Sequence, residues 1–120
     1  MSNSNKYKLR EPQLEAEIYY LTEQEGGRKT AVNNGYRGQF HYNGKDWDAP
    51  QQFIDKETCN LGETVKVYLQ TLSPDFHIGH FFVGQEFETR EGSKIVGKGK
   101  ITRIIRPDIA GASVPLVHTI

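Results

Sequence analysis

Apolar and polar residues alternate along several segments of the chain with the two-residue period of a β-strand. The alternation is clearest in residues 14–21, LEAEIYYL, and in residues 64–72, TVKVYLQTL. It recurs in residues 37–42, 84–90 and 94–105. One face of each strand is therefore expected to be buried, and six of the expected core residues are Ile18, Phe40, Val67, Leu69, Phe87 and Ile101.

A sixth expected strand is weaker. Residues 46–54, DWDAPQQFI, contain Pro50, which lacks an N–H for the ladder and confines the segment to a sheet edge or a break. No segment shows the 3.6-residue period of an amphipathic helix. Because closing a sheet removes its exposed edges, these strands and their turn residues predict an all-β fold, a single six-stranded antiparallel β-barrel.

A length of 120 residues suits one domain with one hydrophobic core. We expect residues 1–13 to be a flexible polar lead-in, residues 14–106 to form the barrel, and residues 107–120 to be a tail that packs on the barrel or meets a partner. The first residues lack the apolar stretch of a signal peptide, no run is long enough to span a membrane, and Cys59 is the only cysteine. These features favour a cytoplasmic protein with no membrane partner.

Charge is balanced over the whole chain but uneven along it. Fifteen Lys and Arg residues match fifteen Asp and Glu residues, so the net charge does not by itself indicate a polyanionic partner. Residues 11–25 contain five acids and no Lys or Arg, whereas residues 90–106 contain six bases and one acid. We therefore expect a molecule with an acidic part and a basic part.

One glycine-rich segment partly matches a phosphate-binding loop. Residues 92–99, GSKIVGKG, fit the first seven positions of that motif, but Gly99 stands where a Ser or Thr would hold magnesium. The segment also leads into an expected strand, whereas the motif requires a helix after the loop. We therefore expect these glycines to mark a bend or close packing in a strand and not a nucleotide site.

The histidines and the cysteine form no recognisable catalytic group. His77 and His80 lie close to Asp75 in the sequence, but a metal site there would need a further ligand from elsewhere. We expect this pair to be solvated loop histidines, and Cys59 to be a small half-buried residue. The sequence therefore predicts no enzyme, cofactor or metal, and an enzyme built on His77 and His80 is the least favoured hypothesis.

Six short motifs follow one another in the chain. They are Ile18 with Tyr19, 26–30 (GGRKT), 35–40 (GYRGQF), 61–63 (LGE), 87–92 (FETREG) and 96–99 (VGKG). In this order they resemble the C-terminal, third β-barrel domain of bacterial elongation factor Tu, and the resemblance covers residues 14–106. It implies the same barrel fold.

The resemblance also implies a function without catalysis. Elongation factor Tu is a GTPase that carries aminoacyl-tRNA to the ribosome, but its nucleotide chemistry lies in a different domain, so we expect a free-standing barrel with no GTPase domain. In that family the third domain packs on the GTPase domain, contacts the nucleotide exchange factor and holds the T stem of tRNA. The leading hypothesis is therefore a translation-related module that binds tRNA or another structured RNA.

Candidate RNA-contacting residues come from the family motifs and from strand parity. By resemblance they are Arg28, Lys29, Thr30, Gln39, Arg90, Glu91, Gly92 and Lys94. In the last strand, two-residue parity places four side chains on one outward face: Lys94, Val96, Lys98 and Lys100. Lys98 and Lys100 are therefore added to the candidates, and the set predicts a basic patch able to contact phosphates.

Three departures from the family pattern indicate that the scaffold is kept while part of the surface differs from that of the family. Residues 41–53 replace a Thr-rich segment, the loop 73–85 is longer, and Gly38 stands in place of a proline. Exposed aromatic residues here would suit a protein interface, with core packing as the competing interpretation; they are Trp47, Phe76, Phe81 and Phe82. The alternative hypothesis is a protein-binding mimic or immunity-like decoy that acts on elongation factor Tu, its exchange factor or a toxin that targets it.

Overall fold

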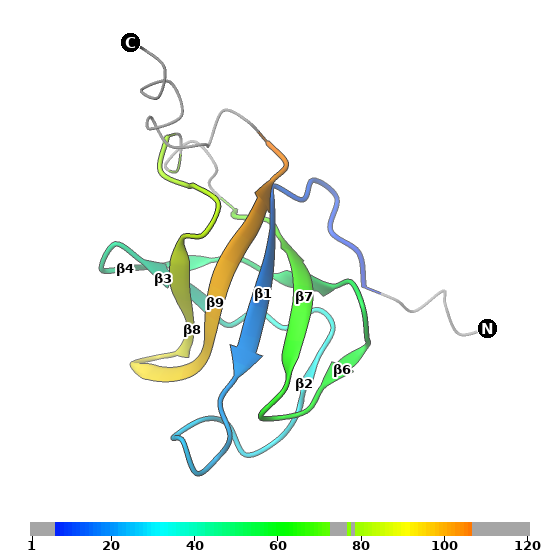
Figure 1. The fold of residues 1–120 in the computed structure, drawn as a ribbon, viewed down its shortest axis with the longest axis vertical. Coiled ribbons are helices and arrows are strands. Elements are labelled where there is room, and N and C mark those ends of the chain that lie inside the picture. Colours follow the sequence, from blue (N-terminus) through cyan, green and yellow to red (C-terminus); the bar gives the residue numbers. More distant parts are fainter. Residues whose placement is uncertain (1–6, 73–76, 78, 107–120) are drawn as a thin grey trace, which may run out of the picture.

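The computed structural model describes residues 7–72, 77 and 79–106. Nine strands lie in this part of the chain (Figure 1): β1 (Leu14–Tyr20), β2 (Val32–Asn33), β3 (Gln39–Tyr42), β4 (Lys45–Asp48), β5 (Gln51–Phe53), β6 (Thr58–Cys59), β7 (Thr64–Leu69), β8 (Glu86–Glu91) and β9 (Lys94–Ile104). The same described part has no helix long and apolar enough to cross a membrane. The expected tail, 107–120, and the first six residues of the expected lead-in lie outside the described residues.

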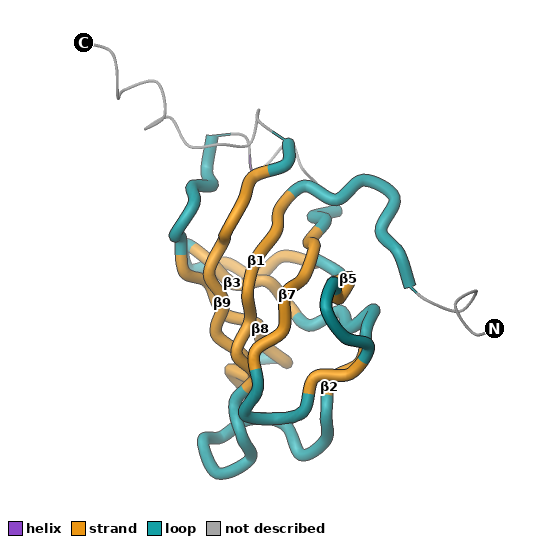
Figure 2. The backbone as a smooth tube through the Cα atoms, turned by 45° about the vertical axis from the view of Figure 1, so that its right-hand side comes forward, coloured by secondary structure: helices purple, strands orange, loops and turns teal. Residues whose placement is uncertain are grey.

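Seven of the strands form one antiparallel sheet in the order β4-β3-β8-β9-β1-β7-β5, and β2 pairs with β6. The large sheet curls, so that β3 and β4 pass behind β9 and β1 (Figures 1 and 2). Its edge strands β4 and β5 are separated in the chain by Ala49 and Pro50 alone, which brings the two edges together. The N–H of Leu72 donates to the carbonyl of Asp48 at 3.4 Å and links the end of β7 to the end of β4. The predicted all-β, barrel-like fold is confirmed.

The predicted number of strands is wrong. Pro50 divides the expected strand 46–54 into β4 and β5, which lie at opposite edges of the sheet. β4 instead forms a hairpin with β3 around Asn43 and Gly44, whose φ angles are 52° and 76°. An Asn-Gly pair favours a two-residue turn with this left-handed backbone, because glycine has no Cβ and asparagine tolerates the conformation.

Burial in the central strands follows the expected alternation. In β1 the inward residues are fully buried, namely Leu14, Ala16, Ile18 and Tyr20. In β7, Val65, Val67 and Leu69 are buried while Thr64 and Lys66 are exposed. All six core residues expected from the sequence are at most 5% exposed, so this prediction is confirmed.

The last strand departs from regular alternation at Val96. Gly97 pairs with Thr89 and Ile95 pairs with Arg90, which leaves Val96 as the additional residue of a β-bulge. The bulge turns its side chain inward, and Val96 is fully buried. The prediction that Val96 points outward with the lysines of this strand is therefore wrong.

The glycines of the last strand permit close packing. A Cβ on Gly99 would overlap the ring of Phe87, and one on Gly97 would lie 3.0 Å from the Ile18 side chain. Residues 94–104 thus form a strand against β8, and no helix follows the Gly92 turn as a phosphate-binding loop would require.

Candidate functional site

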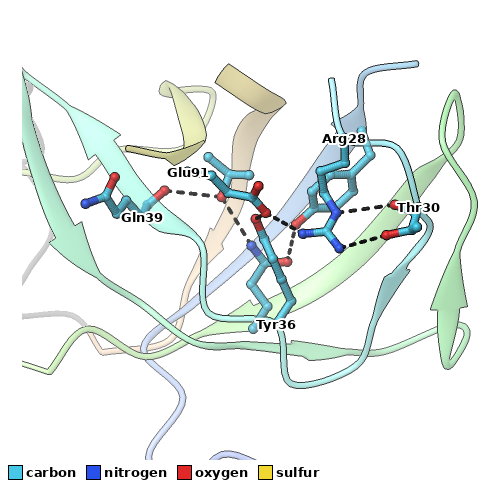
Figure 3. Close-up of polar contacts among 8 residues, drawn as sticks. Arg28, Thr30, Tyr36, Gln39 and Glu91 are labelled. Atoms are coloured by element: carbon cyan, nitrogen blue, oxygen red, sulfur yellow. Dashed lines mark hydrogen bonds and ion pairs between the residues drawn. The ribbon is translucent and has the colours of Figure 1, made fainter. Parts of the chain in front are cut away.

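Side chains from three segments meet around Glu91 at the end of β8. Arg28, from the loop after β1, donates a hydrogen bond from Nη1 to the Glu91 carboxylate, and Tyr36 donates its hydroxyl proton to the same oxygen (Figure 3). Arg28 also donates to Thr30, at 3.3 Å to its main-chain oxygen and 3.2 Å to its hydroxyl. The guanidinium carbon lies 5.0 Å from the centre of the Tyr36 ring, within cation–π range. We call Arg28, Thr30, Tyr36 and Glu91 the Glu91 cluster.

The turn that begins the loop after β1 depends on a pair of glycines. Gly26 has a φ of 94°, which disfavours any side chain, and a Cβ on Gly27 would overlap the carbonyl of Leu21. The amide of Gly27 donates to the carbonyl of Thr22 at 2.8 Å and closes the turn. Because this geometry fixes the start of the loop, it brings Arg28 within reach of Glu91 at the end of β8.

Charge and partial burial set the protonation of the Glu91 cluster. Partial burial raises the pKa of the Glu91 carboxyl, but hydrogen bonds from Tyr36 and Arg28 outweigh it and hold that pKa below its usual value. Burial and the neighbouring carboxylate raise the pKa of the Tyr36 phenol. At neutral pH the cluster therefore contains an ionised carboxylate, a neutral phenol and a charged guanidinium, each in the state that its hydrogen bonds require.

Two further bases adjoin the Glu91 cluster and extend into solvent. Lys29 follows Arg28 in the loop and is exposed, and Lys94 is exposed and directly opposite Glu91 in the β8–β9 hairpin. Gly92 forms the turn of that hairpin with a φ of 64°. Arg28, Lys29 and Lys94 are thus the bases next to Glu91 in the chain or the sheet, and Glu23 and Glu25 are exposed earlier in the loop after β1. The structure brings together most of the motif residues expected from the sequence.

Arg90 faces a different direction and is already paired. Its Nε and Nη2 both donate to one oxygen of Glu88, at 2.8 and 2.6 Å, on the outer face of β8. Glu88 and Arg90 are two residues apart and therefore share that face. Arg90 therefore resembles Arg28 in being paired with a carboxylate, and both side chains are less exposed than Lys29 and Lys94.

Lys98 and Lys100 lie on the outer face of β9 among acidic neighbours. Lys100 is in register with Glu17 of β1 and with Glu86 of β8, and Lys98 is in register with Glu88 of β8. Opposite charges at directly paired positions attract one another, so much of the positive charge here is balanced. An open groove of about 670 Å³ runs over these residues. The role of Lys98 and Lys100 as RNA contacts stays a prediction. Acidic neighbours on β1 and β8 leave these two lysines with less uncompensated positive charge than the sequence of β9 alone indicates.

Gln39 does not join the Glu91 cluster. Figure 3 shows its side chain directed away from Glu91. Its main-chain oxygen accepts a hydrogen bond from the Thr89 hydroxyl at 3.3 Å, and Thr89 in turn accepts one from Gln51 at 3.3 Å. Gln51 accepts the hydroxyl proton of the buried Tyr20 at 2.6 Å, so a polar chain crosses the core and ends at Gln39.

The aromatic residues expected at a protein interface differ in how far they are exposed to solvent. Phe81 is fully buried and packs on Phe40 and Tyr42, so the idea that it is exposed is wrong. Trp47 is partly buried against the core, and Phe82 is 48% exposed. Phe76 lies outside the described residues, as does Asp75.

His77 was expected in solvent but is fully buried. Its Nδ1 meets the hydroxyl of Tyr42, and its ring lies 4.5 Å from that of Trp47. Burial lowers the pKa of His77 to about 4, so the ring is neutral at neutral pH. His80 is exposed, and among the described residues no group of three potential ligands is placed to hold a metal.

Two features of the site were not singled out from the sequence. Tyr36 belongs to the motif GYRGQF, but nothing in that motif indicates that its hydroxyl reaches Glu91, 55 positions away. The burial of His77 likewise depends on partners from distant strands. Long-range contacts of this kind leave no local signal in a single sequence.

Comparison with known families agrees with this arrangement. The family model described as the elongation factor Tu C-terminal domain matches residues 9–105. The match spans all nine strands, including the loop after β1 and the β8–β9 hairpin that build the Glu91 cluster.

Proposed function

Because the chain belongs to the elongation factor Tu C-terminal domain family, a family of translation-factor domains, we propose that it is a non-catalytic module that binds tRNA or a similarly structured RNA. The proposed contact surface is the end of the barrel that carries Arg28, Lys29 and Lys94 beside Glu91. Thr30 and Gly92 shape the two turns that present these bases.

The single observation that carries this proposal is the fixed position of Arg28. Its guanidinium is held by Glu91, by Thr30 and by the face of Tyr36, and its side chain is 22% exposed. A guanidinium that is already ordered loses less conformational freedom when a phosphate binds to its remaining N–H groups. Lys29 and Lys94 flank it as exposed, flexible charges, which suits contact with successive phosphates along a backbone.

The charges around Glu91 favour a partner that carries phosphates, and they also limit the affinity for that partner. Arg28 and Lys94 both adjoin the Glu91 carboxylate, which orders Arg28, and Lys29 adds an exposed charge next to Arg28 in the chain. A surface with only a few contacts gives modest affinity that depends on salt, because each neutralised phosphate releases counterions.

Titration of labelled total tRNA by filter retention tests the proposal. Between about 50 and about 200 mM salt, the logarithm of the association constant should fall linearly with the logarithm of the salt concentration, with a slope of about 0.7 to 0.9 for each phosphate contact. Three contacts would give a slope of roughly 2 to 3. Failure to retain tRNA at the lowest salt concentration would contradict the proposal.

A protein partner is the second candidate, and one observation favours it. Phe82 and Val83 are 48% and 62% exposed, although residues of this kind are usually buried. We propose as the alternative that a translation-machinery protein, or a toxin directed at it, is bound through this turn. Retention of a protein with affinity that is insensitive to salt, together with no tRNA binding, is the result expected for that alternative.

A further inference from the structure

Exposed apolar side chains gather at one end of the barrel. Five large apolar side chains are exposed in the described part of the chain, and three of them lie at this end: Leu72, Phe82 and Val83. Leu72 follows β7, and the other two precede β8. Because β8, β9, β1 and β7 are antiparallel neighbours, the end of β7 and the start of β8 lie at the same end of the sheet. Apolar side chains gathered in one place point to an interaction, whereas single exposed apolar residues do not.

Two of these side chains are held in a turn of fixed shape, residues 82–85, which we call the Phe82 turn. The N–H of Gln85 donates to the carbonyl of Phe82 at 3.1 Å, and the Gln85 side chain accepts from the N–H of Phe82 at 3.1 Å. Gly84 has a φ of 92°, which favours glycine. Phe82 and Val83 are 48% and 62% exposed, so a defined backbone presents both of them to solvent.

The chain leaves the sheet close to the Phe82 turn. The N–H of Gly84 donates to the carbonyl of Ile101 in β9 at 2.7 Å. Ile101 precedes Arg106 by five residues, which is roughly 17 Å along an extended strand. The amides of Ile105 and Arg106 both donate to the carbonyl of Gln13, at 2.8 and 3.2 Å, and fix the point of departure. In Figure 1 the segment before β8 and the end of β9 lie at the same end of the barrel.

The tail that follows Arg106 has the composition of a segment that packs. Residues 107–120, PDIAGASVPLVHTI, contain one Asp and no Glu, Lys or Arg, and their apolar residues include the run 114–117, VPLV. Segments that stay solvated usually have few apolar residues and many charges. The tail also lies beyond residue 105, where the family match ends, so the barrel shared with the family does not account for it.

The small area of the apolar surface favours an occupant from the same chain. A stable interface buries about 800 Å² on each partner, which three partly exposed side chains cannot supply. A tethered segment is present at an effective concentration of roughly millimolar, and it does not lose the translational freedom that a separate molecule loses on binding. A contact too small to hold a free partner is therefore sufficient to hold the tail.

We propose that residues 114–117 of the tail pack on Phe82 and Val83. The ten residues from Arg106 to Leu116 can span up to about 33 Å, which is more than the distance along β9 from Arg106 to the residue that pairs with the turn. A protein that used the Phe82 turn would have to displace the tail. The inference does not depend on RNA binding, because the Glu91 cluster lies at the opposite end of β8 (Figure 1).

Nuclear Overhauser effects in the 120-residue chain test the contact directly. We expect effects between the methyl protons of Leu116 or Val117 and the ring protons of Phe82, with no dependence on protein concentration. In a mixture of labelled and unlabelled protein, no such effect should connect two different molecules. Effects seen only between different molecules would show that a second copy covers the turn and would overturn the proposal, as would the absence of any effect.

Melting temperatures test whether the two segments stabilise the protein through the same contact. Leu116→Ser with Val117→Ser, and Phe82→Ser with Val83→Ser, should each lower the melting temperature. All four changes together should lower it by less than the sum of the two effects, because both pairs remove one shared contact. Strictly additive effects would overturn the proposal.

An exposed apolar residue elsewhere provides the matched control. Ile54 is 39% exposed and follows β5, away from the Phe82 turn. Phe82→Ser with Val83→Ser should change the amide chemical shifts of residues 114–117, whereas Ile54→Ser should leave them unchanged. The same response to both variants, or no response to either, would contradict a specific contact between the tail and the turn.

Discussion

Replacing Leu69 with alanine is expected to lower the free energy of unfolding by about 2–5 kcal/mol. Leu69 is 1% exposed and lies in β7, opposite Leu14 of β1 and Gln51 of β5. Removing most of the Leu69 side chain would leave a cavity where the edge strand β5 pairs with β7. The two edges of the sheet come together close to this position. Because domains of this size are usually stable by about 5–15 kcal/mol, the loss is a large fraction of the total.

Urea denaturation followed by circular dichroism measures this loss. Lys66→Ala is a suitable control, because Lys66 lies in the same strand with its side chain exposed, and its replacement should cost much less. If the two variants were equally stable, Leu69 would not be part of the core and the strand assignment of β7 would be contradicted.

Reversing the charge of Lys29 and Lys94 together, as Lys29→Glu with Lys94→Glu, is expected to weaken tRNA binding by roughly 10- to 100-fold at low salt. Both side chains are exposed, Lys29 next to Arg28 in the chain and Lys94 opposite Glu91, so the two new carboxylates would repel phosphates where the bases attracted them. The slope of the log–log salt plot should also fall by roughly 1.4 to 1.8, because two contacts are lost.

The matched control changes the net charge by the same amount elsewhere. Lys45→Glu with Lys66→Glu reverses two exposed lysines that lie on β4 and β7, away from the Glu91 cluster. Both double variants must melt close to the wild-type temperature. An equal loss of tRNA affinity in the two variants would show that only net charge matters and would contradict a defined contact surface.

The sequence was sufficient to predict the central strands, because their residues alternate between the core and solvent. In β1 and β7 every inward position is apolar, and burial follows that pattern. The edge strands were harder to predict. The Asn43-Gly44 pair is a strong hairpin signal, but the alternation in residues 46–54 predicts one weak strand, whereas Pro50 separates two strands at opposite edges.

The bulge at Val96 could not be predicted from the two-residue alternation of side chains, because that alternation assumes a regular strand without bulges. The additional residue moves Val96 into the core and leaves Lys98 and Lys100 outside. No residue type at this position signals a bulge, because it arises from the register with β8.

The candidate site was predicted in part, through motifs and not through geometry. The family motifs include Arg28, Lys29, Glu91 and Lys94, but they do not indicate which of these residues lie close together in space. The six bases of residues 90–106 suggested a broad basic patch, but Glu17, Glu86 and Glu88 come from other segments and lie next to the lysines of β9. Charge pairing across strands does not appear in a count made along one segment.

The central claim is that RNA is bound at the end of the barrel that carries the Glu91 cluster. Amide chemical shifts of isotope-labelled protein, measured as tRNA is added at low salt, test it most directly. The account predicts shift changes concentrated in residues 28–30 and 91–94, with little change in β7 between residues 64 and 69. Shift changes confined to Phe82 and Val83, or no changes at all, would contradict it.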